Sequence, residues 1–394
     1  MSFFRGWKGW RRFRRLGWEW RHIVFYSESG QDWHQFSGLI TELNERLQVK
    51  TTYVTSDPND AGLAHSHPNF QAIWIPPGLF LTIFFQVNQS EVFVLTMMDL
   101  DNLQLKRSLY PVHYVYLFHS MGSTHMVDHE NSFDHYDSLF CTGPHQVAEI
   151  RRREELRGLP PKHLFEYGHP RLEEVIRQGE EWQGQKKPEC PATILIAPTW
   201  GDHSIFNTCG RELVDVLLQA GYRVIMRPHY HSRRLTPDVI DTLRDHFIKH
   251  ERFEYIDQMG ETDSILRSDL LICDWSAMAM EYSMGLEKPV LFIDVPRRIR
   301  NPNWRELGIE PVESSIREQA GEVLSPESLD LVPAAIERLL SEPDRFRRQV
   351  RQLREKNVFC LGQSIQAGAN EIARLADERH RVRLDREAKG LANG

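Results

Sequence analysis

The sequence is poor in cysteine, and its few cysteines are far apart. The five of them form no Cys-x-x-Cys pair, which argues against a disulfide scaffold and a zinc knuckle and fits a reducing compartment. Long apolar runs are missing as well, because the most apolar window, residues 72–85, is too short to span a bilayer and contains Pro-Pro-Gly at 76–78. Nor is there an excess of positive charge: the formal net charge is −7, which argues against nucleic acid as the main partner.

What is present is the composition of a soluble globular protein. Of the 394 residues, 41% are hydrophobic and 26% are charged. A chain of this length has room for two domains of about 100–200 residues, each with its own core. We find no internal repeat and no low-complexity segment in the sequence.

Residues 1–21 differ from the rest of the chain. They contain seven Lys and Arg against the single Glu19, together with seven Phe and Trp. On a helix most of the rings and most of the cations fall on different sides, although Gly6 and Gly9 weaken such a helix. The pattern predicts a segment that lies on an anionic membrane surface, in a cytoplasmic protein peripheral to the inner face of the cell membrane. The alternative is a basic arm that packs on the protein or stays disordered.

Short apolar runs rich in β-branched and aromatic residues recur along the rest of the chain. In the first half we expect strands at 22–27, 51–56, 71–75, 92–96, 113–118 and 137–142, with a helix at 37–47. In the second half we expect strands at 193–197, 223–227, 253–256, 269–273 and 289–293, with a helix at 207–220. Runs this continuous are typical of strands covered on both faces, and hence of parallel sheets surrounded by helices.

Two such series predict an α/β protein of two doubly wound, Rossmann-like domains facing each other, joined by a polar linker at 179–189. We expect the first domain over 22–180 and the second over 190–342, with C-terminal helices at 343–394 that fold back. Ligands of such sheets bind beyond the carboxyl ends of the strands. The polar residues that follow each strand are therefore the candidates for a site.

The most informative stretch lies at 268–294. It predicts a buried strand, a sharp polar turn at Asp274, a helix that opens with Ser276 and Ala277 and ends at Gly285, and a second buried strand. The first N–H groups of a helix have no partners within it and form an anion site. With Glu281 further along the helix, the pattern suggests a bound nucleotide diphosphate. The alternative is an ordinary strand–helix–strand unit.

Histidine follows the strand expected at 113–118. His119 ends this strand and is followed by a Gly/Ser/Thr turn that contains Ser120 and leads to His125. A neutral imidazole in this place can take a proton from an attacking hydroxyl, because its ordinary pKa lies close to working pH. A structural hydrogen bond is the alternative role.

A second group follows the strand at 223–227 and consists of Arg227, His229 and His231. Cations at a strand end can neutralise charge on a transferring or leaving phosphate. Zinc is the rival interpretation of the His-x-His pair, with a histidine at 125, 129 or 135 as a further ligand. Because no carboxylate or thiolate is correctly spaced beside the pair, we expect no metal.

Two further residues lie in turns near the expected domain junction. Thr199, in the Pro/Thr/Gly turn after the strand at 193–197, can bond a phosphate or merely close the turn. Arg171, in Gly-His-Pro-Arg at 168–171, can contact an acceptor phosphate or form an interdomain ion pair.

Taken in order, these segments resemble the CDP-glycerol glycerophosphotransferase family, which makes and primes teichoic-acid-like polymers. The resemblance covers roughly residues 110–300, and its segments lie at 119–124, 168–173, 197–200, 227–229 and 269–277, with Glu281 and Lys288-Pro289. A weaker similarity lies at 357–375. The family's Trp-His-Gly-Thr-Pro is Phe-His-Ser-Met-Gly here, at 118–122, and its Asp-Tyr-Ser-Ser is Asp-Trp-Ser-Ala, at 274–277.

The resemblance implies a GT-B type architecture, with an N-terminal acceptor domain and a C-terminal nucleotide-donor domain, and peripheral association with membranes. It implies a CDP-linked polyol as donor, a lipid-linked or polysaccharide acceptor, and no cofactor. By resemblance His119 is the base and His229 contacts the donor's phosphates. The expected donor site comprises Thr199, Arg227, Asp274, Ser276, Ala277 and Glu281. The expected acceptor or interdomain residues are Ser120, His125 and Arg171.

Three functions follow from these observations. The first is transfer of a phospho-polyol from a CDP-linked donor to an acceptor hydroxyl in envelope or capsule polymer synthesis, with release of CMP. The second is a GT-B glycosyltransferase that uses a nucleotide sugar. The third is an inactive GT-B-like scaffold for envelope assembly, and the presence of His119, His229 and Glu281 counts against it.

Overall fold

The computed structural model describes residues 2–30, 32–101, 105–183, 191–257 and 262–392. The chain forms two units, each with its own sheet. Unit 1 comprises Met1–Ser120, Asp128–Pro170 and Val358–Gly394, and unit 2 comprises Met121–Val127 and Arg171–Asn357. Of the linker expected at 179–189, residues 184–189 lie outside the described residues.

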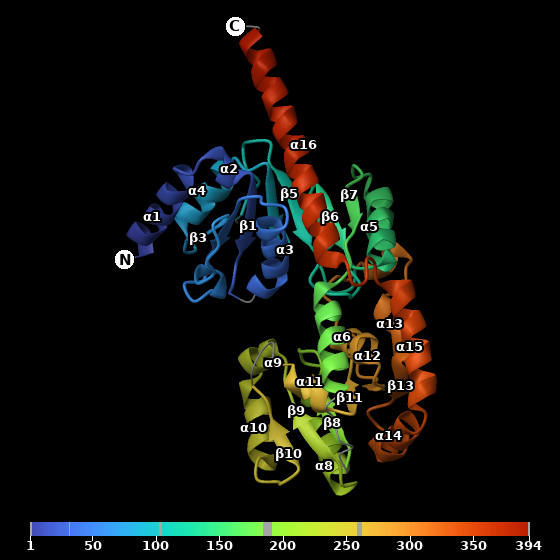
Figure 1. The fold of residues 1–394 in the computed structure, drawn as a ribbon. Helices are drawn as coiled ribbons and strands as arrows, with labels where there is room; N and C mark the ends of the chain where they lie inside the picture. Colours follow the sequence, from blue (N-terminus) through green and yellow to red (C-terminus); the bar gives the residue numbers. More distant parts are fainter. Residues whose placement is uncertain (1, 31, 102–104, 184–190, 258–261, 393–394) are drawn as a thin grey trace. The chain divides into compact units, whose positions relative to one another are not determined.

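Unit 1 is built on a parallel sheet whose described strands run in the order β3-β2-β1-β4-β5-β6-β7 (Figure 1). These strands are β1 (Ile23–Ser27), β2 (Thr51–Thr55), β3 (Phe70–Trp74), β4 (Val92–Leu95), β5 (His113–Leu117), β6 (Ser138–Cys141) and β7 (His163–Glu166). The helices are α1 (Ser2–Arg14), α2 (Trp18–Arg21), α3 (Trp33–Glu45), α4 (Leu79–Val87), α5 (Pro144–Arg157) and α16 (Ser364–Ala392), with a 3-10 turn at Ala61–Leu63.

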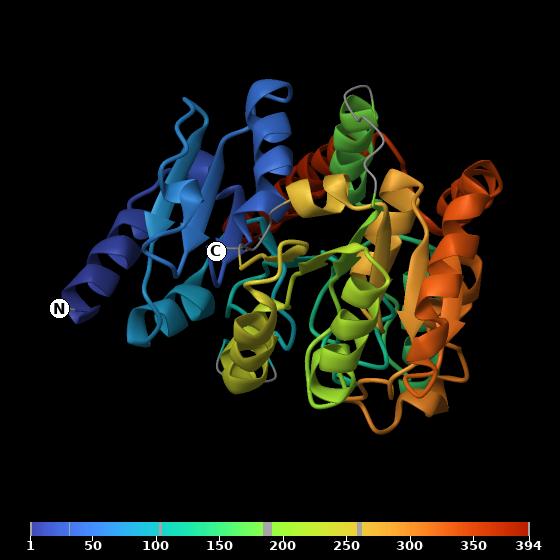
Figure 2. The same cartoon turned by 90° about the horizontal axis from the view of Figure 1, so that it is seen from below.

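Helices cover both faces of this sheet (Figures 1 and 2). On one face Phe36 and Leu39 of α3 and Ile372 of α16 belong to the same fully buried cluster as the strand residues. On the other face Phe13 of α1 and Phe84 of α4 belong to a second cluster. The inner strands β1, β2, β4, β5 and β6 are therefore buried on both sides, which is why they read as continuous apolar runs in the sequence.

Helix α1 packs through its glycines. A Cβ at Gly9 would lie 2.3 Å from the carbonyl oxygen of Trp74, and one at Gly6 would lie 3.2 Å from the ring of Phe80. These two residues therefore permit close approach of the helix to unit 1. Phe13 is only 4% exposed and meets Phe84 edge-on, with ring centroids 4.8 Å apart.

Unit 2 is built on a second parallel sheet, whose described strands run in the order β10-β9-β8-β11-β12-β13. The strands are β8 (Thr193–Ile196), β9 (Arg223–Met226), β10 (Phe253–Tyr255), β11 (Leu270–Cys273), β12 (Val290–Ile293) and β13 (Gly321–Leu324). Its helices are α6 (Pro170–Gln183), α7 (Ile205–Thr208), α8 (Gly210–Gln219), α9 (Tyr230–Leu235), α10 (Pro237–Phe247), α11 (Asp263–Arg267), α12 (Met278–Leu286), α13 (Val312–Ala320), α14 (Val332–Ser341) and α15 (Pro343–Asn357). Short 3-10 turns lie at Trp304–Leu307 and Leu329–Leu331.

The α/β class with two doubly wound sheets is confirmed, and each of the eleven expected strands lies within one residue of its expected bounds. Strands β7 and β13 were not expected. The helix expected at 207–220 is divided into α7 and α8. Among the described helices, none combines the length and the hydrophobicity needed to cross a bilayer.

The helix expected to open at Ser276 and to end at Gly285 differs at both ends. It begins at Met278 and continues through Gly285 to Leu286, with Glu287 as a left-handed cap at φ 56°. Gly285 is a contact residue and not a stop, because a Cβ there would lie 2.6 Å from Cγ1 of Val175 on α6. The sequence pattern could not distinguish these two uses of glycine.

Candidate active site

The sheet of unit 2 has its topological switch point between β8 and β11. The chain continues from β8 to β9 and β10 on one side, whereas β11, β12 and β13 lie on the other. Ligands of doubly wound sheets bind beyond the carboxyl ends of the strands at such a point. Thr199 follows β8, Arg227 and His229 follow β9, and Asp274 follows β11. The structure thus gathers these candidates at one sheet edge.

Asp274 holds the two sides of the switch point together. Its side chain is fully buried, and it accepts the backbone N–H of Thr199 at 2.7 Å and that of Ile205 at 3.4 Å. Burial raises the pKa of this carboxyl from 3.8 to about 6, against the lowering effect of the backbone donors. We therefore interpret Asp274 as a residue that positions the loop after β8.

This pKa shift predicts how the Asp274→Asn variant will behave. The carboxyl keeps its proton up to about pH 6 in the fold but only to about pH 3.8 when unfolded. Its contribution to the free energy of unfolding is therefore present at low pH and is lost as pH rises from about 4 to 7, by about 3 kcal/mol at most. We expect the variant, measured by urea unfolding, to gain stability relative to wild type over this range. The exposed Asp245→Asn is the control, and an opposite slope would contradict the expectation.

The start of α12 supplies fewer free donors than the sequence suggested. The Oγ of Ser276 accepts the N–H of Met278 at 3.3 Å, and the carbonyl of Ser276 accepts that of Ala279 at 3.1 Å. The N–H of Met280 is bonded to the carbonyl of Ala277 at 3.1 Å. Ser276 and Ala277 lie half-buried in the turn before the helix, not in its first turn.

Glu281 and Arg171 come together in unit 2. Nε of Arg171 on α6 lies 4.0 Å from Oε2 of Glu281 on α12, and both side chains are partly buried. The helices meet at this level because Gly285 admits Val175 between them. Arg171, expected to contact the acceptor or to form an interdomain pair, is thus placed beside a donor candidate.

His229 follows β9 in an extended conformation and caps α9. Its Nδ1 accepts the backbone N–H of His231 at 3.1 Å, so the neutral ring carries its proton on Nε2. Desolvation, followed by the charges of His231, Arg298 and Arg233, lowers the pKa of His229 from 6.5 to about 4. At neutral pH His229 is therefore an uncharged N–H donor and not a cation, as the sequence-based interpretation had assumed.

Two side chains beside His229 were not foreseen. The ring of Trp200, next to Thr199, lies 6.3 Å from the ring of His229, and the guanidinium of Arg298 lies 3.3 Å from the centre of the Trp200 ring. Arg298 follows β12 at the same sheet edge. Its place after a strand was the available signal, but the Arg-rich loop carried no recognisable motif.

A cavity of about 720 Å³ lies next to the turn at Asp274 and is lined in part by Trp275, Arg297 and Arg317. The indole of Trp275 is bonded through Nε1 to the carbonyl of Val295 at 2.8 Å. Guanidinium carbons of Arg317 and Arg297 lie 3.9 and 4.6 Å from its ring centre. Carboxylates of the same lining pair with both cations, Asp294 with Arg317 at 2.9 Å and Glu310 with Arg297 at 2.8 Å. The volume of the cavity fits a small-molecule site.

His119 lies two residues beyond β5 in unit 1, where part of the residue is open to solvent and the surrounding protein desolvates its ring. Desolvation, aided by the charges of His169 and His34 and opposed by Asp32, lowers its pKa below the ordinary 6.5. The imidazole is therefore neutral at working pH, as a general base must be. Asp32 follows β1 and accepts the hydroxyl of Ser27 at 3.1 Å. The sequence analysis had not selected Asp32, although its place after a strand was visible.

Ser120 and His125, both expected in the acceptor or interdomain group, belong to different units. The carbonyl of Ser120 accepts the side-chain amide of Gln146 at 2.9 Å within unit 1. His125 is 1% exposed and belongs to unit 2, where its Nε2 lies 3.0 Å from the carbonyl oxygen of Ile309. The backbone oxygen of His125 also accepts the amide of Asn301 at 2.9 Å.

The zinc interpretation gains no support from the described residues. The group among them with the spacing of metal ligands is His22, Glu91 and His380 in unit 1. It contains neither His229 nor His231.

Two doubly wound parallel sheets, with polar side chains gathered at the switch point of the second, define a GT-B type fold. Residues 119–296 match the sequence model of a family described as CDP-Glycerol:Poly(glycerophosphate) glycerophosphotransferase. The matched region begins at His119 and includes every expected donor residue. The resemblance seen in the sequence is thereby confirmed over this region of the chain.

Solved structures share the fold at low sequence identity. The wall teichoic acid polymerase TagF, soaked with CDPG, is 14% identical over 96% of this chain and 98% of its own, with a TM-score of 0.57. A glycosyltransferase from Rickettsia africae is 9% identical over 90% and 98% of the two chains, with a TM-score of 0.53. The UDP-GlcNAc 2-epimerase of Methanocaldococcus jannaschii is 12% identical over 84% and 99%, with a TM-score of 0.51. Among curated proteins no sequence matches the chain.

Proposed function

We propose that the protein transfers a phospho-polyol from a CDP-linked donor to a hydroxyl of a lipid-linked or polysaccharide acceptor and releases CMP, in the synthesis of an envelope or capsule polymer. One observation carries the proposal: Thr199, Arg227, His229 and the turn at Asp274 gather at the switch point of unit 2, within the region that matches the glycerophosphotransferase family.

In the proposed reaction the acceptor oxygen attacks the phosphorus that carries the polyol. The bond between this phosphorus and the bridging oxygen breaks, and CMP leaves with the electron pair. His119, neutral because its pKa is lowered, takes the proton of the acceptor hydroxyl. The Nε2–H of His229 and the guanidinium of Arg227 donate to phosphate oxygens and stabilise the charge that grows on CMP.

The nucleoside is assigned to the cavity beside Trp275. Its volume of about 720 Å³ lies within the range of roughly 300–1,000 Å³ that small-molecule sites occupy. The neighbouring turn at Ser276 then faces the phosphates, and Glu281 faces hydroxyl groups of the donor. Support for a CDP-linked donor comes from the family match and from TagF, whose structure was obtained with CDPG.

The purified protein tests the proposal directly. It is incubated with CDP-glycerol, CDP-ribitol and a set of UDP-sugars, with a lipid-linked acceptor analogue, and release of CMP and UDP is followed by chromatography. We expect acceptor-dependent CMP release from a CDP-polyol. UDP release from a nucleotide sugar, with no CMP, would establish the glycosyltransferase instead. Absence of both, from a protein that binds its donor, would favour the scaffold.

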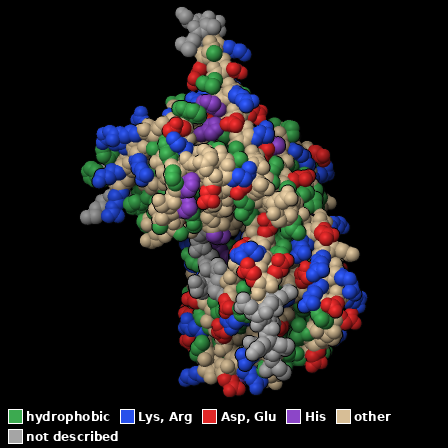
Figure 3. All heavy atoms as spheres, in the orientation of Figure 1, with side chains coloured by type: hydrophobic (Ala, Val, Ile, Leu, Met, Phe, Trp, Pro, Cys, Tyr) green, Lys and Arg blue, Asp and Glu red, His purple; other side chains and the backbone are tan. Residues whose placement is uncertain are grey.

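We further propose that α1 holds the enzyme on an anionic membrane. Lys8 and Arg12 of α1 and Arg15 directly after it are exposed, and Phe4 of the same helix is 70% exposed. Figure 3 shows basic and hydrophobic side chains together over the part of unit 1 where α1 lies. Deletion of residues 1–21 cannot test this idea cleanly, because Phe13 and Trp10 contribute to the core of unit 1.

Charge removal without loss of the core is the better test. The variant with Lys8, Arg12 and Arg15 replaced by Ser loses three charges worth about 1 kcal/mol each. We therefore expect its affinity for anionic liposomes, measured by sedimentation, to be about 100-fold lower. The control replaces three exposed arginines of α15, at 345, 347 and 348, by Ser. Equal losses in the two variants would show that α1 has no special role.

A further inference from the structure

A further polar cavity lies in unit 1, and none of the expected site residues lines it. It has a volume of about 220 Å³ and lies between α2, the segments at 89–91 and 110–112, and α16. The charged residues that line it are Arg21, Arg379, Arg383 and Arg386 against Glu91 and Glu387. The cavity therefore has an excess of two positive charges, the reverse of the chain as a whole.

Two of these guanidinium groups have an N–H without a hydrogen-bond partner. The Nε–H groups of Arg21 and Arg379 are buried and have no hydrogen-bond partner. Desolvation, followed by the nearby charge of Arg383, lowers the pKa of Arg21. All four arginines line the cavity, where a guanidinium group can donate paired hydrogen bonds to the oxygens of an anion.

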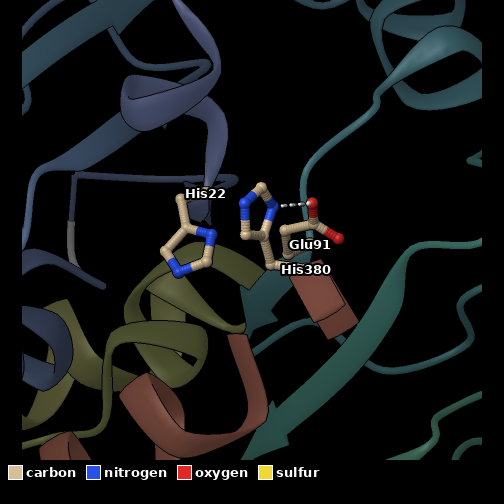
Figure 4. Close-up of side chains that lie close together, drawn as sticks. All are labelled: His22, Glu91 and His380. Atoms are coloured by element: carbon tan, nitrogen blue, oxygen red, sulfur yellow. Dashed lines mark hydrogen bonds and ion pairs between the residues drawn. The ribbon is translucent and has the colours of Figure 1, made fainter. Parts of the chain in front are cut away.

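A cluster at one wall fixes this arrangement. Oε1 of Glu91 lies 2.6 Å from Nε of Arg383 and 3.2 Å from Nδ1 of His380. Figure 4 shows the contact between His380 and Glu91, with His22 on the other side of the His380 ring. The ring of Trp18 stacks on His380 at 4.4 Å. Although His22, Glu91 and His380 have the spacing of metal ligands, the guanidinium of Arg383 already neutralises the carboxylate. We therefore read the cluster as an anchor for α16.

The surroundings indicate where the anion comes from. Trp18 and Tyr110 on the rim are 50% and 46% exposed, and Leu384, between the lining arginines of α16, is 47% exposed. A neighbouring cavity of about 320 Å³ shares Arg21 and Tyr110 with the first and extends to Trp10 and Arg14. The arginine-lined cavity is thus continuous with the basic and aromatic surface of α1. Aromatic rings around cations are typical of the membrane interface.

We propose that this cavity binds the phosphomonoester headgroup of a membrane lipid. A phosphomonoester carries a charge of about −1.5 to −2, which matches the excess charge of the lining, and its oxygens accept from arginine forks in pairs. The cavity is too small for a nucleotide, since sites for such ligands occupy roughly 300–1,000 Å³. The inference rests on the membrane part of the proposed function and gives it headgroup selectivity, which the exposed charges of α1 do not supply.

The test compares liposomes of phosphatidylcholine that contain either phosphatidate or phosphatidylserine, adjusted to equal surface potential. We expect the full-length protein to bind phosphatidate liposomes at least about tenfold more tightly than phosphatidylserine liposomes. One charge-assisted hydrogen bond that only the phosphomonoester makes would give a difference of this size. The variant with Arg379→Gln and Arg386→Gln should lose this preference and keep its binding to phosphatidylserine. Arg386→Gln alone, at an exposed residue, should reduce the preference without risk to the fold.

Two controls separate this inference from the others. Arg381→Gln removes an exposed charge of α16 outside the cavity lining and should leave the preference intact. The triple variant of α1 should weaken binding to both liposomes and keep their ratio. The inference would be overturned if the wild type showed no preference for phosphatidate, or if the preference survived in the double variant. It would also be overturned if inorganic phosphate, at the concentration of the lipid phosphate, displaced the protein from the phosphatidate liposomes. CMP release from CDP-glycerol, measured on the same proteins, reports on the catalytic proposal separately.

Discussion

Replacing His119 by Ala is expected to lower the turnover of acceptor by about 10²–10⁴-fold, the usual cost of losing a general base. Donor affinity should change little, because His119 belongs to unit 1 and the donor candidates belong to unit 2. The fold should also persist, since the residue is exposed and lies beyond the end of β5. Single-turnover measurements with saturating donor give the rate, and titration with CMP gives the affinity.

The pH profile provides a readout that a structural role would not give. Because desolvation lowers the pKa of His119 below 6.5, the wild-type rate should be at its plateau at neutral pH and should fall only when the solution becomes acidic enough to protonate the ring. The His119→Ala variant should lack this acidic limb. His246→Ala, at an exposed histidine on α10, is the matched control. Near-normal turnover in His119→Ala would show that His119 is not the general base.

Replacing His229 by Ala is expected to affect both donor affinity and rate. Loss of one positioned donor to a developing anion typically costs about 10²–10³-fold in kcat. The proton of His229 is on Nε2, because Nδ1 accepts the N–H of His231. Gln, which offers an amide N–H at a similar reach, should therefore restore part of the activity.

Neighbouring residues serve as controls for His229. His231→Ala removes a ring that stacks near His229, with centroids 5.4 Å apart, but leaves the Nε2 donor in place, so a much smaller loss is expected. If His229→Ala reduced only the melting temperature and left both kcat and donor affinity unchanged, His229 would be a cap of α9 and nothing more. The absence of any rescue by Gln would argue that charge, and not hydrogen bonding, is what matters at this position.

Most of the strands that the sequence predicted are buried on both faces, and the edge strands β3 and β10 are the exceptions. The residues of β1, β5 and β11 are almost completely buried, and so each strand is a continuous apolar run that sequence inspection finds within one residue. The sequence did not predict strands β7 and β13, because they are not continuously buried. They lie at sheet edges, His163 and Val323 are exposed, and without continuous burial no apolar run is required.

The glycines show where local reasoning fails. From the sequence, Gly9 was expected to weaken its helix and Gly285 to end its helix. Both lie inside helices that approach a neighbouring segment closely. Gly168 is a further case: its φ is 92°, and a Cβ there would lie 2.3 Å from the carbonyl oxygen of Phe359, almost two hundred residues along the chain. No local pattern carries information about such a partner.

The sequence by itself determined the α/β class, the two series of strands and the residues that follow each strand, because these depend on local hydrophobic patterns and on the order of motifs. Only the tertiary structure decided the surroundings of each candidate. Asp274 became a buried support, His125 a buried residue bonded to Ile309, and His229 a neutral donor, because burial and distant neighbours set hydrogen bonds and pKa values. The arginine-lined cavity likewise joins residues near 21 and 91 to residues near 380, a proximity that the parallel sheet and the return of α16 create.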